Sequence, residues 1–333
     1  MLAEFLRQAR EDRPVYITDV RRAFQSGGTR PFHIHVRLYD GTVRQFPLRL
    51  PETRTPEEAE FVRSYVHAML YNILSSLGAL RIDLYLDPSD RECAEMAQAL
   101  DTVFQTELPK ASRTGFGKCL NVNERTVFAL TQGRESFSFR VCDIAGEPQV
   151  SEPETLACSE PVFSALPAMT RGKLLLGIDI GGTDIKLAVS FDGELALCKE
   201  FDWFPASFAT AEELIDPILL LTRLLRAAGT LYAQGKKEQI DAAALSKTAT
   251  MAEMARGAAA MEQAAGSLRS FDAIGLCFPD VVIRNRIVGG ETYKTRGMRE
   301  NTALDYEVQF AKITDLCTLL RAYVVPGGAV MNT

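Results

Sequence analysis

The chain has 333 residues, of which 47% are hydrophobic and 24% charged, and its formal net charge is −6. These values are typical of a globular protein long enough for two domains, and the acidic balance argues against a nucleic-acid partner. No apolar run reaches the roughly 20 residues of a membrane span, and the seven cysteines form no Cys-x-x-Cys pair, so we expect a reduced, cytoplasmic protein without a membrane partner.

The first region, residues 1–145, is predicted to be a separate α+β domain of unknown role. Alternating apolar residues predict a strand over 32–38, and Asp40-Gly41 predicts a hairpin turn into a second strand over 43–50. Pro47 suggests that this second strand lies at an edge of its sheet or is bulged. The other elements expected here are a helix from the capping pattern Thr55-Pro56-Glu57-Glu58 to Gly78, a strand over 80–86, a helix from 87 to about 106, and strands near 126–130 and 136–144.

His33 and His35 lie two residues apart on the first predicted strand, so their side chains share a face. Two histidines at this spacing can bind a metal ion. A polar outer face of the sheet explains them more simply, and we favour that interpretation.

Residues 146–171 contain four prolines and little periodicity, which predicts a linker, and a second domain is expected over 172–333. Its predicted elements are strands over 174–180, 184–190 and 194–201, a helix over 211–232, a helical stretch over 237–268, a strand over 273–278 buried on both faces, a helix over 304–322, and short strand segments at 324–325 and 329–331.

The segment from Leu174 to Lys186 is the most informative part of the chain. An apolar strand delivers Asp179 to its end, and a Gly181-Gly182-Thr183 turn follows. Two glycines let the backbone come close to a ligand, and their N–H groups with the Thr183 hydroxyl can donate to phosphate oxygens. A carboxylate beside a phosphate requires a cation between them, so Asp179 is predicted to hold Mg²⁺ through water. Lys186 could add positive charge or equally point to solvent.

The pattern Asp-x-Gly-Gly-Thr-x-x-Lys resembles phosphate-binding segment 1 of the sugar kinase and actin-like ATPase superfamily. It is most similar to the ROK family of glucokinase-like sugar kinases and sugar-responsive repressors. The resemblance covers residues 174–333 and implies an α/β, ribonuclease H-like N-terminal lobe that binds ATP and Mg²⁺ together with a sugar-like small molecule. The predicted order of strands and helices is the one expected of that lobe.

Two departures from the family concern the substrate. Asp280 stands where the family has glycine, and no Asn-rich sugar loop follows. In its place lies a glycine-bounded loop, in which Glu291, Lys294 and Arg296 could bind substrate or form a solvated charged surface.

The final strand resembles the family strand that leads into Asn-Asp, whose Asp is the general base. By this resemblance Asn332 is a substrate-binding candidate, and the catalytic residue is expected just beyond Thr333. The second phosphate segment and the adenosine pocket belong to the family's second lobe. The chain is therefore expected to be a piece of a longer protein and inactive alone.

Three functions stay open from the sequence. The first is an ATP-dependent small-molecule kinase, with sugar as the expected phosphoryl acceptor. The second is a ROK-like sugar or nucleotide sensor without catalysis, and the third is a scaffold that acts through residues 1–145. The sheet-rich N-terminal region and the negative charge disfavour DNA binding, and a homo-oligomer is left open.

Overall fold

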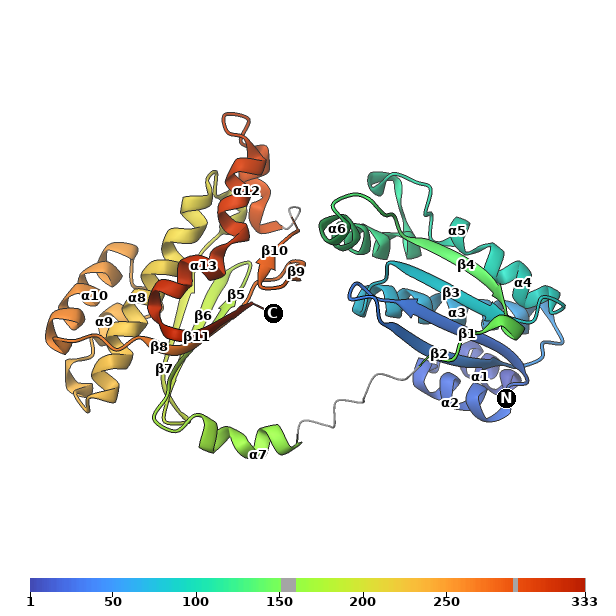
Figure 1. Ribbon diagram of the computed structural model, residues 1–333, viewed down its shortest axis with the longest axis horizontal. Coiled ribbons are helices and arrows are strands. Elements are labelled where there is room, and N and C mark those ends of the chain that lie inside the picture. The colour runs from blue at the N-terminus through green and yellow to red at the C-terminus, as the bar shows by residue number, and fades with distance from the viewer. Residues whose placement is uncertain (151–159, 290–292, 333) are drawn as a thin grey trace. The chain divides into compact units, whose positions relative to one another are not determined.

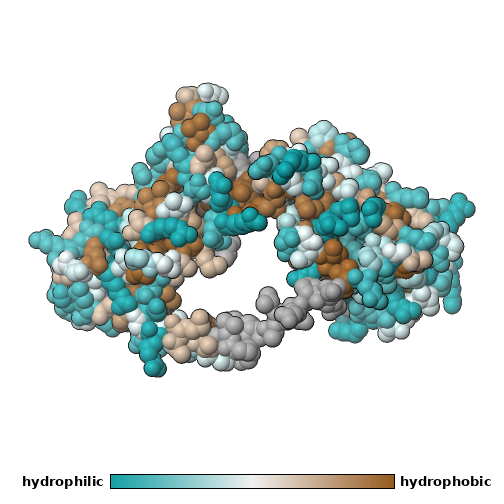
Figure 2. Space-filling view, viewed as in Figure 1, coloured by the Kyte–Doolittle hydropathy of each residue, from teal (hydrophilic) through white to brown (hydrophobic). Residues whose placement is uncertain are grey.

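The computed structural model of the protein describes residues 1–150, 160–289 and 293–332 (Figure 1). The chain divides into two compact units, Met1–Ala157 and Cys158–Thr333, and each unit has its own hydrophobic core. Each unit combines helices with a sheet of parallel and antiparallel strands, so the fold is mixed α/β. Within the described residues no helix is both long and apolar enough to cross a bilayer. Figure 2 shows polar and charged residues spread over the visible surface, with apolar patches between them.

The first unit contains a four-stranded sheet in the order β2-β1-β3-β4. Its strands are β1 (Arg30–Arg37), β2 (Val43–Leu50), β3 (Arg81–Leu86) and β4 (Ser138–Asp143). Strand β1 pairs antiparallel with β2 and β3, whereas β3 and β4 are parallel. The helices of this unit are α1 (Leu2–Arg10), α2 (Ile17–Gly27), α3 (Pro56–Ser76), α4 (Arg91–Gln98), α5 (Leu100–Val103) and α6 (Cys119–Thr131).

Alternate side chains of β1 pack one face of this sheet against the core. Phe32, Ile34 and Val36 point to one side and are fully buried with residues of the surrounding helices. The prediction that Pro47 lies on an edge strand is confirmed, because β2 is the outermost strand. The backbone N–H that Pro47 lacks is therefore not needed for a hydrogen bond to a further strand on the outer side of β2.

The predicted capping box at the start of α3 is half formed. The Thr55 side chain accepts a hydrogen bond from the backbone N–H of Glu58 at 3.2 Å. The Glu58 carboxylate accepts from the N–H of Arg54 and not from that of Thr55. The hydroxyl cap is enough to start the helix at Pro56, the position where proline is best tolerated.

Two predictions for the first unit are wrong. Residues 126–130 are not a strand but belong to α6, which the Asn123 side chain holds in place: its amide accepts from the Ala79 N–H at 2.8 Å and donates to the Ala79 carbonyl at 3.0 Å. This tertiary contact overrides the strand preference of the local residues. The helix predicted from 87 begins later, because Asp90 supplies the cap, and it is interrupted between α4 and α5.

The outer face of the same sheet carries a cluster formed by His33, His35 and Glu147. His33 Nδ1 lies 2.8 Å from Glu147 Oε2, and His35 Nε2 lies 2.7 Å from Glu147 Oε1. His35 is only 2% exposed, so the expected polar outer face is covered at this position. The described residues contain no group of three ligands suited to a metal ion. The two imidazoles therefore bind a carboxylate that follows β4.

The cluster predicts a pH-dependent contribution to the stability of the first unit. Burial would raise the pKa of Glu147, but the hydrogen bonds from His33 and His35 outweigh it, and the pKa lies below the ordinary 4.5. A lowered carboxyl pKa stabilises the folded state above pH 4.5, and this stabilisation is lost as the pH falls through the lowered value. We expect Glu147→Gln to be less stable than wild type at pH 6, with the difference shrinking below pH 4.5.

Thermal unfolding of the two proteins across this pH range measures the effect. Glu107→Gln, which changes an exposed carboxylate of the same unit, is the matched control and should follow wild type. A constant difference between Glu147→Gln and wild type down to pH 3 would contradict the role of the carboxylate.

The second unit contains a five-stranded sheet in the order β11-β8-β5-β6-β7. Its strands are β5 (Leu174–Ile180), β6 (Asp184–Phe191), β7 (Glu194–Asp202), β8 (Phe271–Cys277) and β11 (Val324–Asn332), and a separate small hairpin is formed by β9 (Val282–Ile283) and β10 (Arg286–Ile287). Strands β5, β6 and β7 form an antiparallel meander, while β8 and β11 run parallel to β5.

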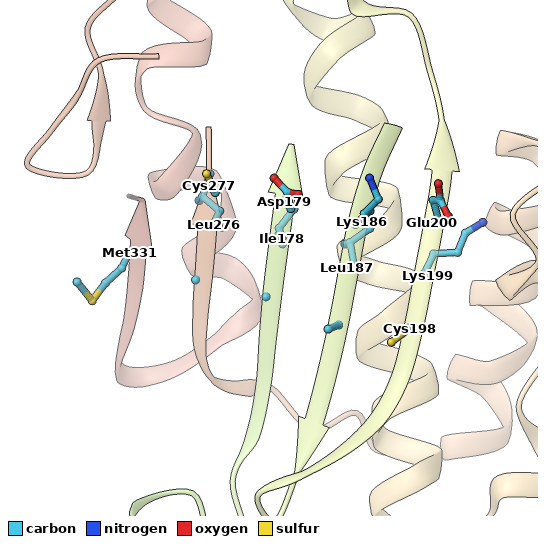
Figure 3. Close-up of a pocket in the computed structure, with 13 residues that line it drawn as sticks. Ile178, Asp179, Lys186, Leu187, Cys198, Lys199, Glu200, Leu276, Cys277 and Met331 are labelled. Carbon is cyan, nitrogen blue, oxygen red and sulfur yellow. The ribbon is translucent and has the colours of Figure 1, made fainter. Parts of the chain in front are cut away.

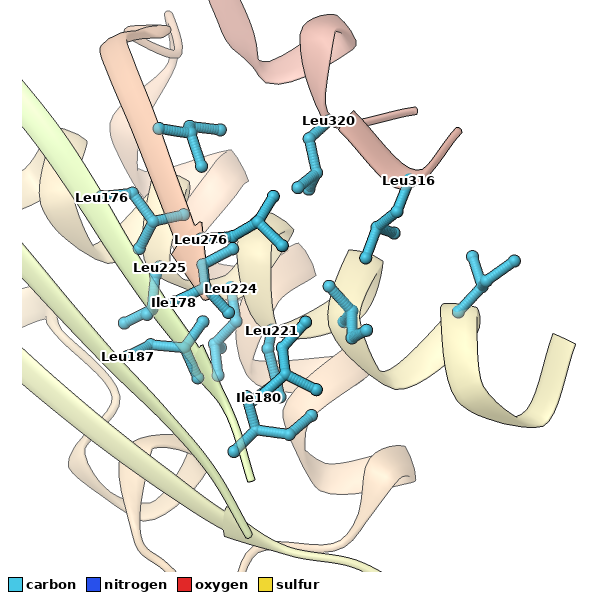
Figure 4. Close-up of a cluster of buried hydrophobic side chains, with 14 of the residues drawn as sticks. Leu176, Ile178, Ile180, Leu187, Leu221, Leu224, Leu225, Leu276, Leu316 and Leu320 are labelled. Atoms are coloured by element: carbon cyan, nitrogen blue, oxygen red, sulfur yellow. The ribbon is translucent and has the colours of Figure 1, made fainter. Parts of the chain in front are cut away.

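Helices cover one face of this sheet and build the core (Figure 4). The helices of the second unit are α7 (Glu160–Met169), α8 (Ala211–Ala233), α9 (Ala242–Leu245), α10 (Met251–Ala265), α11 (Arg296–Glu300), α12 (Tyr306–Thr314) and α13 (Leu316–Leu320). Helix α8 begins with a complete capping box between Thr210 and Glu213. Its Leu221, Leu224 and Leu225 are fully buried with alternate residues of β5 and β6.

The three strands of the meander and helix α8 form where the sequence predicts them, whereas other expectations for the second unit are wrong. The predicted linker contains α7, which accommodates Pro167 inside the helix. The stretch over 237–268 is divided between α9 and α10, and the helix over 304–322 is divided between α12 and α13. Strand β8 is not buried on both faces, since Gly275 and Cys277 are exposed on the side away from the helices.

Candidate functional site

The carboxyl ends of the parallel strands β5, β8 and β11 meet at one edge of the second sheet. Here β5 ends at Ile180, and the turn Gly181-Gly182-Thr183 leads back into β6. The Thr183 side chain is exposed. Ligands of open α/β sheets bind outside the carboxyl ends of the strands, so the position of this turn suits a binding site.

Trp203, the residue after β7, makes two hydrogen bonds to the turn. Its indole Nε1 donates to the Gly181 carbonyl at 3.0 Å, and its backbone N–H donates to the Thr183 carbonyl at 3.0 Å. The side chain is 8% exposed and packs edge-to-face against Phe208. Two hydrogen bonds to carbonyls on either side of Gly182 fix the turn, a role that the sequence alone did not indicate.

The two glycines of the turn serve different purposes. A Cβ atom on Gly181 would lie 2.5 Å from the backbone carbonyl oxygen of Asp184, so only glycine fits there without a shift. A Cβ atom on Gly182 would meet nothing within 4 Å. Neither glycine has a positive φ, so backbone conformation alone does not demand them. Close approach within the hairpin explains Gly181, and Gly182 borders open space.

This difference predicts that alanine destabilises the protein at Gly181 and has little effect on stability at Gly182. Gly181→Ala should destabilise the second unit by about 1–3 kcal/mol, because a backbone oxygen cannot rotate away from the added carbon. Gly182→Ala should change stability by less than about 0.5 kcal/mol, as surface substitutions do. Urea unfolding of the two variants measures both values, and equal stabilities would contradict the geometry of the turn.

Asp179 and Lys186 face each other across the hairpin, where they form a registered pair of β5 and β6. Asp179 is exposed and makes no hydrogen bond or ion pair with any described residue. The Lys186 ammonium lies 2.8 Å from Asp184 Oδ1, and this hydrogen bond raises its pKa. Asp184 is thus the partner of Lys186, and Asp179 keeps a carboxylate available to a cation.

The face of the sheet that bears Asp179 forms a broad cavity of about 920 Å³, lined by residues of all five strands (Figure 3). A row of mostly small, exposed residues crosses it from strand to strand, namely Met331, Gly275, Gly177, Ala188 and Cys198. The next row toward the carboxyl ends of β5 and β8 is polar and consists of Cys277, Asp179, Lys186 and Glu200. The turn and Asp179 therefore stand at one end of an open hollow.

Lys294 and Asn332 are the two predicted substrate residues that the structure brings to this edge. Lys294, in the 3₁₀ turn η6 (Tyr293–Thr295), is 6% exposed, and its Nζ lies 5.9 Å from the centre of the Phe278 ring. Burial lowers its pKa, and the negative charges of Asp179 and Asp280 oppose that shift. Asn332, also 6% exposed, accepts a hydrogen bond from the Phe278 N–H at 3.2 Å.

The remaining predicted residues are not part of this group. Arg296 is exposed, and its guanidinium forms an ion pair with Glu300 at 2.8 Å that raises its pKa. Glu291 lies outside the described residues. Sequence reasoning noticed Asp280 only as a departure from a family pattern, yet its carboxylate lies close to the backbone of Gly289 and its charge acts on Lys294.

The residues present are compatible with Mg²⁺ held through water. The described residues contain no cluster of three metal ligands, but Mg²⁺ is commonly bound by one or two carboxylates together with substrate phosphates. Asp179 is an exposed carboxylate next to a turn whose carbonyl groups are already fixed by Trp203.

Neither models of known protein families nor curated protein sequences match this chain. The assignment of a function therefore depends on the fold and on the geometry of this edge.

Proposed function

We propose that the second unit binds the phosphates of a Mg²⁺-nucleotide and belongs to an ATP-dependent small-molecule kinase. The observation that carries this proposal is the turn Gly181-Gly182-Thr183, with Thr183 exposed, beside the Asp179 carboxylate, which has no partner among the described residues, at the carboxyl end of a central strand. Backbone N–H groups of a glycine turn and a hydroxyl are suitable donors for phosphate oxygens. Open space at Gly182 leaves room for a ligand.

The strand order supports the finer fold that this proposal includes. An antiparallel meander β5-β6-β7 is followed by helix α8 and by two more strands, of which β8 pairs with β5 and β11 pairs with β8. This arrangement is the one expected of the ribonuclease H-like lobe in the sugar kinase and actin-like ATPase superfamily. We therefore propose that fold for the second unit, and a cytoplasmic location and a sugar-like acceptor with it.

Each residue has a defined role in the proposal. Asp179 orients Mg²⁺ through water, while Gly181, Gly182 and Thr183 surround the phosphates. Bound Mg²⁺ supplies neutralisation of phosphate charge, which is the main requirement of phosphoryl transfer besides positioning. Lys186 contributes little, because Asp184 already neutralises it.

Calorimetry with magnesium tripolyphosphate tests the proposal without depending on an adenosine pocket. We expect saturable binding that requires Mg²⁺ and that Mg²⁺-ATP displaces. Adenosine alone should not compete. Binding that is the same with and without Mg²⁺, or the absence of binding, would refute the phosphate site.

Two other functions are kept as alternatives. The same turn would serve a sensor that binds nucleotide without transferring phosphate, and turnover of Mg²⁺-ATP with a panel of sugars by the protein distinguishes it from a kinase. A scaffold role is favoured by β4, an edge strand of the first unit with exposed Val141, since such an edge can pair with a peptide strand. Pull-downs that compare this chain with a Val141→Lys variant test that role.

A further inference from the structure

Lys294 is a buried cation without a close anionic partner. Its side chain is 6% exposed, and it makes no hydrogen bond or ion pair with any described residue apart from its position over the Phe278 ring. Asp179 and Asp280 are near enough to act on its charge but do not reach ion-pair distance. Buried ammonium groups in proteins are ordinarily paired, so an anion bound at this edge would supply a partner for Lys294.

An unsatisfied donor of Asn332 adjoins the backbone of the same residue, Phe278. Asn332 Oδ1 accepts from the Phe278 N–H, which assigns the two ends of the amide. The Nδ2 group is then buried and has no acceptor among the described residues. The backbone N–H of Asn332 donates to Asn285 Oδ1 at 3.1 Å, so the end of β11 is held in position. Buried polar groups left without partners call for an explanation, and a bound ligand is one.

Both donors therefore adjoin the same residue, Phe278, at the edge where β5 delivers Asp179. We propose that Lys294 and Asn332 form an oxyanion-binding subsite that accepts a phosphoryl or carboxylate group of the ligand bound at this edge. The identity of that ligand depends on the proposed kinase function. The group comes either from the terminal phosphate of the nucleotide or from an acidic acceptor such as a sugar acid.

The acidic neighbours of Lys294 determine when an anion can bind. The carboxylates of Asp179 and Asp280 oppose the effect of burial on the pKa of Lys294 and repel an anion. When a cation is bound at Asp179, that carboxylate no longer balances the lysine, and the local charge becomes more positive. An oxyanion then gains both a charge-assisted hydrogen bond from Lys294 and a neutral one from Asn332.

Binding of inorganic phosphate to this chain tests the subsite directly. At constant ionic strength, with chloride as the replaced anion, we expect Lys294→Met to weaken phosphate binding by at least about tenfold, as loss of a charged hydrogen bond does. Arg296→Met is the matched control, because it removes an exposed cation from the same segment. Lys294→Arg keeps the charge and should retain most of the affinity. Equal phosphate affinity of wild type and Lys294→Met, or no phosphate binding to wild type, overturns the proposal.

Further probes identify the source of the anion. If the subsite takes the terminal phosphate, Lys294→Met weakens Mg²⁺-ATP but leaves Mg²⁺-ADP unchanged. If it takes the acid group of an acceptor, the variant weakens gluconate and leaves both nucleotides and neutral glucose unchanged. Either result supports the subsite, and no effect on any of these anions refutes it.

The failure of the kinase proposal can be recognised separately. If Asp179→Asn does not alter Mg²⁺-ATP binding while phosphate binding still requires Lys294, the anion subsite stands and the nucleotide assignment falls.

Discussion

Replacing Asp179 by asparagine should lower the affinity of the chain for magnesium tripolyphosphate by about 10- to 100-fold, the usual effect of losing a group that orients a metal ion's ligands. The side chain is exposed and unpaired among the described residues, so the folded structure does not depend on it. The substitution keeps the size of the side chain and removes its charge. A loss of affinity with unchanged thermal stability would therefore report the role of the carboxylate in binding.

Glu200→Gln is the matched control for this experiment. Glu200 lies in the same polar row of the same sheet face, two strands away from Asp179, and pairs with Lys247 at 2.8 Å. The Glu200→Gln variant should bind magnesium tripolyphosphate as the wild-type protein does. Without Mg²⁺, Asp179→Asn should bind tripolyphosphate no more weakly than wild type, because the carboxylate then only repels the anion. An equal loss in both variants would show a general effect of surface charge.

Leu224→Ala should destabilise the second unit by about 2–5 kcal/mol, the range found for leucines truncated in closely packed cores. Leu224 is fully buried in α8, within the cluster that joins this helix to the sheet and to Leu316 and Leu320 of α13 (Figure 4). Removing it leaves a cavity beneath the strands that carry the turn. We expect weaker tripolyphosphate binding at temperatures near the unfolding transition of the second unit, although Leu224 is far from the glycine turn in sequence.

Scanning calorimetry is the measurement, since each unit has its own core. The transition of the second unit should shift to lower temperature, and that of the first unit should stay in place. Leu195→Ala, at a position that is 65% exposed in β7, is the control and should change stability by less than about 0.5 kcal/mol. A shift of both transitions would mean that the two units unfold together.

The sequence predicted the second sheet well because local patterns determine it. The alternation of Leu174 to Ile180, the paired glycines and the Asp192-Gly193 turn specify a meander with short connections, and those strands appear within one residue of their predicted ends.

Long-range contacts explain what local patterns missed. Asn123 of α6 binds the backbone of Ala79, 44 residues away, and no local pattern indicates this contact. The hydrogen bond from the Trp203 indole to Gly181 spans 22 residues and has no local signal. The exposure of Cys277 depends on which face of the sheet the helices cover, and an apolar run does not reveal that.

The same limit applies to the candidate site. The sequence indicated Asp179 and the glycine turn through their spacing, and it also suggested Lys294, Arg296 and Asn332 as a loosely defined group. Burial separates these three, because Arg296 is exposed and paired while Lys294 and Asn332 are buried around Phe278. Three-dimensional packing was needed to distinguish a binding candidate from a solvated charge.

The most direct test of the central claim uses Trp203, the single tryptophan of the chain, whose indole is bonded to the turn itself. Its fluorescence should change saturably on titration with magnesium tripolyphosphate, with a midpoint that moves to about 10- to 100-fold higher concentration in Asp179→Asn. If the fluorescence stays constant up to millimolar ligand while calorimetry detects no heat of binding, the turn is not a phosphate site.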